Sequence, residues 1–309
     1  MFVYTNTNLK HVVMKYVITG GAGHISSPVA ENLLSAGHDV TVIGRSETNL
    51  QPLVQLGAKA ATGSLTDEAF LVKTFAGADA VYTMIPPNYS VPNFRHYQNE
   101  VARNYLAAIK SNSIKNVVVL SSVGAHMGNG AGPVDGLADY ENLLGGYKDA
   151  NVRMLRPSYF MYNLFAMIPL IKNMNIMGSN FGGAGEKLVL VHTNDIAAVV
   201  TEELLNLNFT GHSVRYIASD ERTTDEIAAV LSNAVEKPGI PWVVFSDEQA
   251  LEGMTQAGLP ETIAAAYATM GKAIREGKMQ EHYWNNKPEL SPSRLENFAK
   301  EFAAAYHAG

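Results

Sequence analysis

A glycine-rich stretch near the start of the sequence has the residue types and the spacing of a phosphate-binding turn. Gly21-x-Gly23-x-x-Ser26 follows the apolar run Lys15–Thr19 and precedes a helical pattern. Glycine lets the main chain approach a pyrophosphate, and a helix N-terminus favours its negative charge. A strand before and a helix after favour a dinucleotide-binding turn; the alternative is an ordinary glycine-rich connection. The residues expected to hold the cofactor here are Thr19, Gly20, Gly21, Gly23, His24 and Ile25.

The end of the second predicted strand, Asp39–Ile43, bears on which dinucleotide binds. A carboxylate at this place usually holds the ribose 2′-hydroxyl of NAD. The chain instead reads Gly44-Arg45-Ser46, without a carboxylate. A guanidinium pairs well with a phosphate through two parallel hydrogen bonds. Arg45 and Ser46 therefore predict NADP(H) in preference to NAD(H); the alternative for Arg45 is a solvated surface side chain.

Other residue patterns that carry chemistry are missing from the sequence. There is no cysteine, which excludes disulfides, a thiolate nucleophile and Cys-ligated metals. The nine histidines show no metal-ligand spacing, so we expect no metal site. The segment 182–187 lacks the Walker spacing, and no Gly-x-Ser-x-Gly elbow is present.

Composition limits the class of protein and its partners. The chain has 309 residues, 47% of them hydrophobic and 17% charged, which is enough for a sizeable core. A net charge of -6 gives no general attraction to nucleic acid or to an anionic membrane. No signal-peptide pattern and no apolar run of about 18 residues is present. We expect a cytoplasmic protein, a monomer or homodimer, whose partner is a small molecule.

Short apolar runs alternate with helical patterns through the first half of the chain. This alternation predicts an α/β fold with a doubly wound parallel Rossmann sheet and a smaller, mostly helical C-terminal substrate lobe. We expect a flexible extension over residues 1–13 and an NAD(P)-binding domain over 14–155. The remainder, 156–309, would hold further Rossmann elements (about 186–210) and the lobe, which begins near Arg215. The predicted strands are Lys15–Thr19, Asp39–Ile43, Lys59–Gly63, Ala80–Ile85, Asn116–Ser121 and Val152–Leu155.

Helix starts are marked by capping patterns. Thr223 with Glu226 forms a capping box before a helix, and Ser246 with Gln249 forms another. Asn194 or Asp195 is expected to cap the helix that follows it. The predicted helices of the first half are 28–36, 50–56, 67–75 and 94–110.

Several stretches together resemble the NmrA-like group of atypical short-chain dehydrogenases, over about Lys15 to Met279. They keep the order and spacing of that family, which makes the resemblance fairly specific. The stretches are Ile18-Thr19-Gly20-Gly21-Ala22-Gly23, Gly63-Ser64-Leu65-Thr66-Asp67, Met84-Ile85-Pro86-Pro87, Leu120-Ser121-Ser122, Leu155-Arg156-Pro157-Ser158-Tyr159-Phe160 with Asn163, and Val191-His192-Thr193-Asn194-Asp195-Ile196-Ala197.

The resemblance implies places for several residues. Ser64 and Leu65 would flank the adenine of the cofactor, and Met84, Ile85 and Pro86 would line the nicotinamide ribose. Ser121 and Ser122 would lie near the nicotinamide, and Phe160 and Asn163 would face the substrate cleft. The alternatives are strand core for Met84 and Ile85, a strand stop for the prolines, and a turn or cap for the serines. Apart from the resemblance, Tyr82, Tyr89 and Tyr159 with Phe160 suggest an aromatic cleft for a flat substrate.

The sequence departs from the usual catalytic pattern of short-chain dehydrogenases. That pattern pairs a tyrosine with a lysine four residues on, on one face of a helix. Tyr140 is present, but position 144 is leucine, and Leu137 replaces the lysine that many NmrA-like reductases carry four residues before Glu141. Tyr283 and Lys287 match the spacing by chance, since Pro288 disfavours helix there. Tyr140 and His126 are the candidate catalytic residues, although a loop or solvated histidine is the alternative for His126.

These observations leave two functions in competition. The first is an NAD(P)H-dependent oxidoreductase that passes hydride to a quinone-like acceptor, which takes its protons from water. The second is a non-catalytic NAD(P)-binding redox sensor that acts through a protein partner, as some NmrA-like proteins do; the absent lysine favours it, and the full second lobe disfavours it. A sugar-nucleotide epimerase ranks last because it needs the Tyr/Lys pair.

Overall fold

A computed structural model describes residues 12–183 and 185–308 of the chain. Seven parallel strands form its main sheet, with the glycine-rich turn at the carboxyl end of the strand near the centre. In spatial order the strands are β3 (Lys59–Thr62), β2 (Asp39–Gly44), β1 (Lys15–Thr19), β4 (Ala80–Thr83), β5 (Asn116–Leu120), β6 (Asn151–Pro157) and β10 (His212–Ile217).

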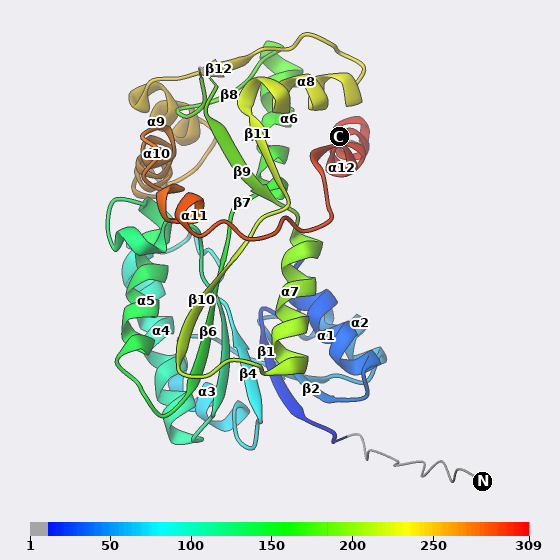
Figure 1. Cartoon of the computed structure of the whole chain (residues 1–309), viewed down its shortest axis with the longest axis vertical. Helices are drawn as coiled ribbons and strands as arrows, with labels where there is room; N and C mark the ends of the chain where they lie inside the picture. Colours follow the sequence, from blue (N-terminus) through cyan, green and yellow to red (C-terminus); the bar gives the residue numbers. More distant parts are fainter. Residues whose placement is uncertain (1–11, 184, 309) are drawn as a thin grey trace, which may run out of the picture.

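Helices cover both faces of this sheet (Figure 1). One face packs against α1 (Ser26–Ser35), α2 (Glu47–Gln55) and α7 (Thr193–Asn206). The other packs against α3 (Glu68–Thr74), α4 (Phe94–Ser111) and α5 (Asp135–Gly145). Because both faces are covered, the central strands are apolar and buried, as in Val117, Val118 and Val119 of β5, all fully buried. The predicted doubly wound parallel fold is confirmed.

A smaller lobe lies beyond the carboxyl ends of the strands, in the upper part of Figure 1. It has its own apolar core and two small sheets, β11-β9-β7 and β12-β8, so it is less purely helical than expected. Its strands are β7 (Tyr159–Phe160), β8 (Met177–Ser179), β9 (Lys187–Val191), β11 (Asp220–Thr223) and β12 (Trp242–Val244). Its helices are α6 (Met167–Met174), α8 (Thr224–Ala234), α9 (Asp247–Gln256), α10 (Glu261–Arg275), α11 (Glu281–Asn285) and α12 (Leu295–Ala308). Three 3-10 helices complete the described chain: η1 (Ala125–Met127), η2 (Gly132–Val134) and η3 (Met161–Ala166).

The second half of the chain is divided differently from the expected boundaries. Strand β6 continues to Pro157, so a boundary after residue 155 would cut through it. Arg215 lies in β10 of the main sheet, and β9, within the predicted Rossmann range 186–210, pairs with β7 and β11 of the lobe. Strand pairing joins segments far apart in sequence, and a single sequence does not reveal it. The predicted extension, residues 1–13, lies outside the described residues except for Val12 and Val13, which are exposed.

Helix starts follow the predicted caps in two of three cases. Both capping boxes are formed, at Thr223 for α8 and Ser246 for α9. The expected cap of α7 is wrong: His192 caps this helix through Nδ1, which accepts from the backbone N–H of Asn194. Asp195 is buried and accepts hydrogen bonds from the hydroxyls of Ser219 and Ser293. It therefore ties the C-terminal segment to α7. No helix among the described residues is long and apolar enough to cross a membrane.

Candidate functional site

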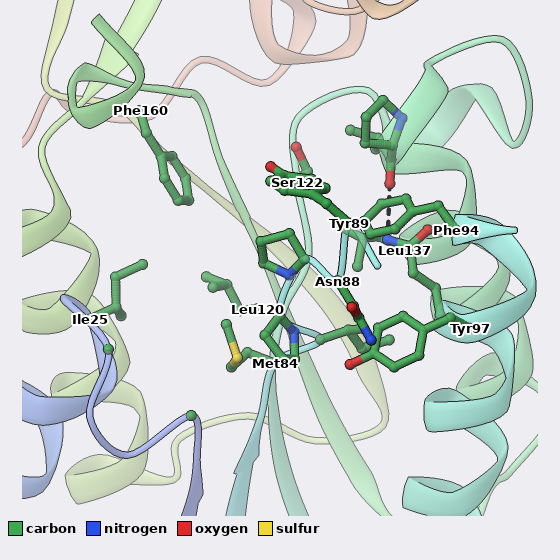
Figure 2. Close-up of a pocket in the computed structure, with 18 of the residues that line it drawn as sticks. Ile25, Met84, Asn88, Tyr89, Phe94, Tyr97, Leu120, Ser122, Leu137 and Phe160 are labelled. Atoms are coloured by element: carbon green, nitrogen blue, oxygen red, sulfur yellow. Dashed lines mark hydrogen bonds between the residues drawn. The ribbon is translucent and has the colours of Figure 1, made fainter. Parts of the chain in front are cut away.

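One large cavity, of about 1360 Å³, lies at the carboxyl edge of the main sheet and extends under the smaller lobe. In Figure 2, Ile25 and Phe160 stand on one side of this space and Phe94 and Tyr97 on the other, with Met84 and Leu120 between them. Most of the predicted site residues line it. From the predicted cofactor set these are Gly20, Gly23, His24, Ile25, Arg45, Ser46, Ser64, Leu65, Met84, Ile85, Pro86, Ser121 and Ser122, and from the predicted substrate set Tyr89, Tyr159, Phe160 and Asn163.

The glycines of the turn are required by close packing. Gly20 has φ +70°, a left-handed conformation that favours glycine. A Cβ at Gly21 would lie 2.8 Å from Cβ of Val42 on β2, so Gly21 supports the turn from below and does not line the cavity. Ser26, where the fingerprint has its third glycine, is 2% exposed and lies beneath the turn at the start of α1. The absence of a side chain at Gly21 therefore lets the turn pack against β2.

The start of α1 fits an anionic group. Its N-cap residue, Ile25, makes no side-chain cap, and its first turn holds no acidic residue. The N–H groups and positive end of a helix left without a cap attract a phosphate. Together with a cavity that begins at this turn, these features fit the pyrophosphate of a dinucleotide.

The backbone at Met84 is fixed from two directions. Its N–H donates to the Thr19 hydroxyl (2.9 Å), and its carbonyl accepts from the Tyr105 hydroxyl (2.8 Å). Thr19 is fully buried and does not line the cavity. Thr19 therefore positions the cavity wall at the end of β4, and its predicted contact with the cofactor is replaced by this supporting role.

A buried ion pair lies behind Ser121. The Ser121 hydroxyl donates to the Glu141 carboxylate, which also accepts from Arg156 Nε at 2.9 Å. Arg156 donates further to the Tyr216 hydroxyl at 3.0 Å. All of Ser121, Glu141 and Arg156 are less than a tenth exposed. Because its only proton is directed at Glu141, the Ser121 hydroxyl has lone pairs left with which to accept a hydrogen bond from a ligand in the cavity.

The open end of the cavity carries the residues predicted to select the cofactor. Arg45 is exposed, and Ser46 caps α2 through a weak bond to the N–H of Asn49 (3.4 Å). The Ser64 hydroxyl lies 2.8 Å from that of Thr66, and the Leu65 carbonyl accepts from Asn104 (3.1 Å). Arg45, Ser46 and Ser64 line this end of the cavity together, so a phosphate bound beside them would meet a guanidinium and hydroxyls.

The structure places both candidate catalytic residues away from the cavity. Tyr140 is 1% exposed, and its hydroxyl lies 3.0 Å from that of Thr83 behind the cavity wall. Burial raises the pKa of Tyr140 well above its ordinary value. His126 does not line the cavity either, and its ring stacks on that of His282 with centroids 5.2 Å apart. Burial, then His282 and Arg156, lowers its pKa. Neither side chain reaches a ligand in the cavity, because helical spacing turns Tyr140 into the core and η1 points His126 towards α11.

The half of the cavity predicted to hold the substrate is aromatic, and much of its wall was not apparent from the sequence. The hydroxyls of Tyr89 and Tyr267 are 2.7 Å apart. The His24 ring contacts that of Tyr162, with centroids at 4.5 Å. Residues of the wall that the sequence did not single out are Phe94, Tyr97, Tyr162, Tyr267, Met270, Ile274 and Met279. Three of them come from α10, which has no motif, so no sequence signal indicated it.

Ser158 is another residue that sequence reasoning missed. It is 3% exposed, lines the cavity just beyond β6, and its hydroxyl has no hydrogen-bond partner in the described structure. A buried hydroxyl without a partner is costly, and a bound ligand would satisfy it. No group of acidic or histidine side chains suited to a metal ion is found in the described residues.

Comparisons with known proteins agree with this geometry. Residues 20–207 match the profile of the NAD(P)H-binding family. Over nearly its whole length the chain is 25% identical to an NAD(P)H azoreductase of Xenophilus azovorans, covering 94% of this chain and 99% of the relative. Among solved structures, an NADPH-dependent quinone oxidoreductase of Escherichia coli superposes with a TM-score of 0.74 at 19% identity, covering 93% and 98% of the two chains. A triphenylmethane reductase of Citrobacter sp. in complex with NADP(H) gives 0.74 at 18% identity, covering 94% and 99%. These matches confirm the predicted NmrA-like relationship.

Proposed function

This chain belongs to the NAD(P)H-binding family, and we propose that it is an NADPH-dependent reductase of flat, conjugated small molecules of quinone type. One observation carries the proposal: a single cavity joins the phosphate-binding turn to an aromatic wall. A cofactor along the turn and a flat acceptor against the tyrosines would therefore share one cavity. The names of the azoreductase and quinone oxidoreductase relatives fit this class of reaction.

Each end of the cofactor would have its own residues. The turn and the N-terminus of α1 would hold the pyrophosphate, and Arg45 with Ser46 the 2′-phosphate. Ser121 would accept from a donor at the other end, while Met84, Ile85 and Pro86 line the wall beside it. When bound, the nicotinamide would supply a hydride. The protein contributes orientation and exclusion of water.

The absence of the Tyr/Lys pair fits a conjugated acceptor. Reduction of a simple ketone creates a strongly basic alkoxide, which a nearby acid must protonate. Hydride addition to a quinone creates a delocalised anion, which takes a proton from water. Leu137 makes the wall apolar where a lysine would stand, and Tyr140 points away from it. This arrangement favours the conjugated acceptor over a ketone or a sugar.

Turnover tests the proposal directly. The protein is mixed with NADPH and, in turn, a benzoquinone, a triphenylmethane dye and an azo dye, and loss of the nicotinamide absorbance band is followed. We expect turnover with at least one acceptor and a preference for NADPH over NADH. A protein that binds NADPH tightly and reduces none of the three would contradict the proposal.

That result would favour the second candidate, a non-catalytic NAD(P)-binding redox sensor. The observation in its favour is that neither Tyr140 nor His126 reaches the cavity. A sensor would bind oxidised and reduced cofactor with different affinities and would change its affinity for a protein partner accordingly.

A further inference from the structure

Two tyrosine hydroxyls meet on the substrate side of the cavity. Tyr267, on α10, lies 2.7 Å from Tyr89, in the loop that follows β4. Both residues line the cavity, but they differ in exposure: Tyr89 is 42% exposed, whereas Tyr267 is partly buried. The pair therefore connects the inside of the cavity with solvent.

The pair is held in place by aromatic packing. The Tyr89 ring packs on that of Phe94, with centroids 6.4 Å apart, and meets the Tyr267 ring edge-on at 6.2 Å and 70°. Two phenols that share one hydrogen bond use one of their two protons for it. The second proton remains available to a ligand, and donation within the pair strengthens it as a donor.

We propose that Tyr267 is the proton donor of this site, resupplied from solvent through Tyr89, and that it serves acceptors whose reduction leaves a strongly basic nitrogen anion, azo compounds above all. This inference rests on the proposed reductase function and narrows its substrate class. It places the proton donor in the smaller lobe, at a tyrosine that has glycine, not lysine, four residues on.

Reduction of an azo group to a hydrazine takes one hydride and one proton. Hydride forms an N–H bond at one nitrogen, and the π electron pair of the N=N bond moves to the other nitrogen. That nitrogen takes the phenolic proton of Tyr267 and completes the hydrazine. The Tyr267 phenolate takes the proton of Tyr89, and Tyr89 recovers one from water at its exposed edge.

The surroundings of Tyr267 suit donation of its proton to a strongly basic anion rather than to a weakly basic one. Burial raises the pKa of Tyr267 above its ordinary value. A phenol of this kind stays protonated over the working pH range, and its phenolate readily takes a proton from its neighbour. No lysine among the described residues lines the cavity to lower that pKa. A nitrogen anion is basic enough to take the proton, whereas a hydroquinone anion has little need of it.

Acceptors that differ in their need for a proton provide the test. A triphenylmethane dye is a cation, and hydride alone converts it to its neutral leuco form. An azo dye needs hydride and a proton. General acids contribute roughly 10²–10⁴-fold to rate, so in Tyr267→Phe we expect the ratio of azo to triphenylmethane turnover to fall about hundredfold. The azo reaction of the unaltered protein should also slow in D₂O, while the dye reaction should not.

Tyr162→Phe is the matched control. Tyr162 lines the same cavity, is 44% exposed, and its hydroxyl has no hydrogen bond in the described structure. Its loss should leave the ratio of azo to triphenylmethane turnover unchanged. If Tyr267→Phe slows both acceptors equally, or neither, the proton-donor role is overturned.

A spectroscopic measurement on the cofactor-free protein separates this inference from the proposed function. A neutral aminoazobenzene dye that accepts a hydrogen bond from Tyr267 should show a shifted absorption band on binding, and Tyr267→Phe should abolish the shift while the dye still binds. An unaltered shift in Tyr267→Phe overturns the inference even if turnover is normal. Failure of every acceptor to turn over, with the shift present, overturns the reductase function instead.

Discussion

The two halves of the cavity are built in different ways. The cofactor half consists of the glycine-rich turn, residues 20–26, with the ends of β2, β3, β4 and β5 beside it. The substrate half is assembled from the loop after β4, η3 and α10, and its central contact, between Tyr89 and Tyr267, joins residues 178 positions apart. The cofactor half would hold a phosphate mainly through backbone N–H groups and a helix N-terminus. The substrate half would hold an acceptor through side chains.

This difference has a physical origin. A phosphate is bound by N–H groups of a turn, and the turn needs glycine at fixed positions whatever surrounds it. A flat acceptor is bound by aromatic surface, which any suitably placed helix can provide. Changes to the cofactor half should therefore alter cofactor binding, and changes to the substrate half should alter the choice of acceptor.

The largest expected effect is loss of the ion pair behind Ser121. Glu141→Ala leaves the Arg156 guanidinium buried without its carboxylate partner. Breaking a buried pair in this way costs about 3–5 kcal/mol, so we expect a fall of that size in the free energy of unfolding, measured by urea denaturation. Asp39→Ala, which breaks the exposed pair with Lys59 (3.6 Å), should cost far less. Equal losses in the two variants would show that Glu141 and Arg156 do not support the cavity wall.

The next largest effect is expected from a substitution at Gly132, which packs against α10. Gly132 has φ +59°, and a Cβ there would lie 2.0 Å from the carbonyl oxygen of Ala266. Overpacking of this kind costs about 1–3 kcal/mol, and Gly132→Ala should displace α10 and with it Tyr267. We expect lower stability and a lower ratio of azo to triphenylmethane turnover, with an unchanged Kd for NADPH. The control is Gly145→Ala in α5, where a Cβ would meet nothing within 4 Å. A weakened NADPH affinity in Gly132→Ala would mean that the two halves are not independent.

Arg45→Glu tests the cofactor half alone. Removing the guanidinium and adding a carboxylate should reverse the preference for NADPH over NADH by at least tenfold, or about 1.4 kcal/mol. The choice among acceptors should not change. Arg103→Glu makes the same change of charge on α4 at an exposed residue that does not line the cavity. If both variants shift the cofactor preference equally, the shift comes from the change in net charge, and a direct contact between Arg45 and the cofactor is contradicted.

The smallest expected effect is on stability at acid pH, and it comes from the ion pair between Arg95 and Asp139. Arg95 on α4 donates to Asp139 on α5 at 2.7 Å and to the Gly128 carbonyl at 3.2 Å. This guanidinium lowers the pKa of Asp139. The stability that this ion pair contributes is present above the pKa of an unfolded aspartate, about 3.9. It is lost as the pH falls through the lower pKa of Asp139 in the folded protein. Asp139→Asn should cost under about 1 kcal/mol at neutral pH and should flatten acid unfolding below pH 4; an unchanged acid profile would exclude this pair as its source.

The fold and the cofactor half were largely predictable from the sequence. Continuous apolar runs such as Asn116–Leu120 and the alternation with helices indicated a covered parallel sheet. The capping boxes at Thr223 and Ser246 are formed as predicted, because a cap depends on residues three apart. The glycine spacing placed the turn at the carboxyl end of β1, where the cavity begins.

Only the tertiary structure decided the remainder. It turned Tyr140 into the core, used Asp195 to hold the C-terminal segment, left the Ser158 hydroxyl without a partner at the cavity, and brought Tyr267 to Tyr89. A turn or a cap is specified by neighbouring residues, so the sequence determined the glycine-rich turn at which the cavity begins. A wall made by helices from distant segments depends on how those helices pack, so only the tertiary structure decided which side chains line the rest of the cavity.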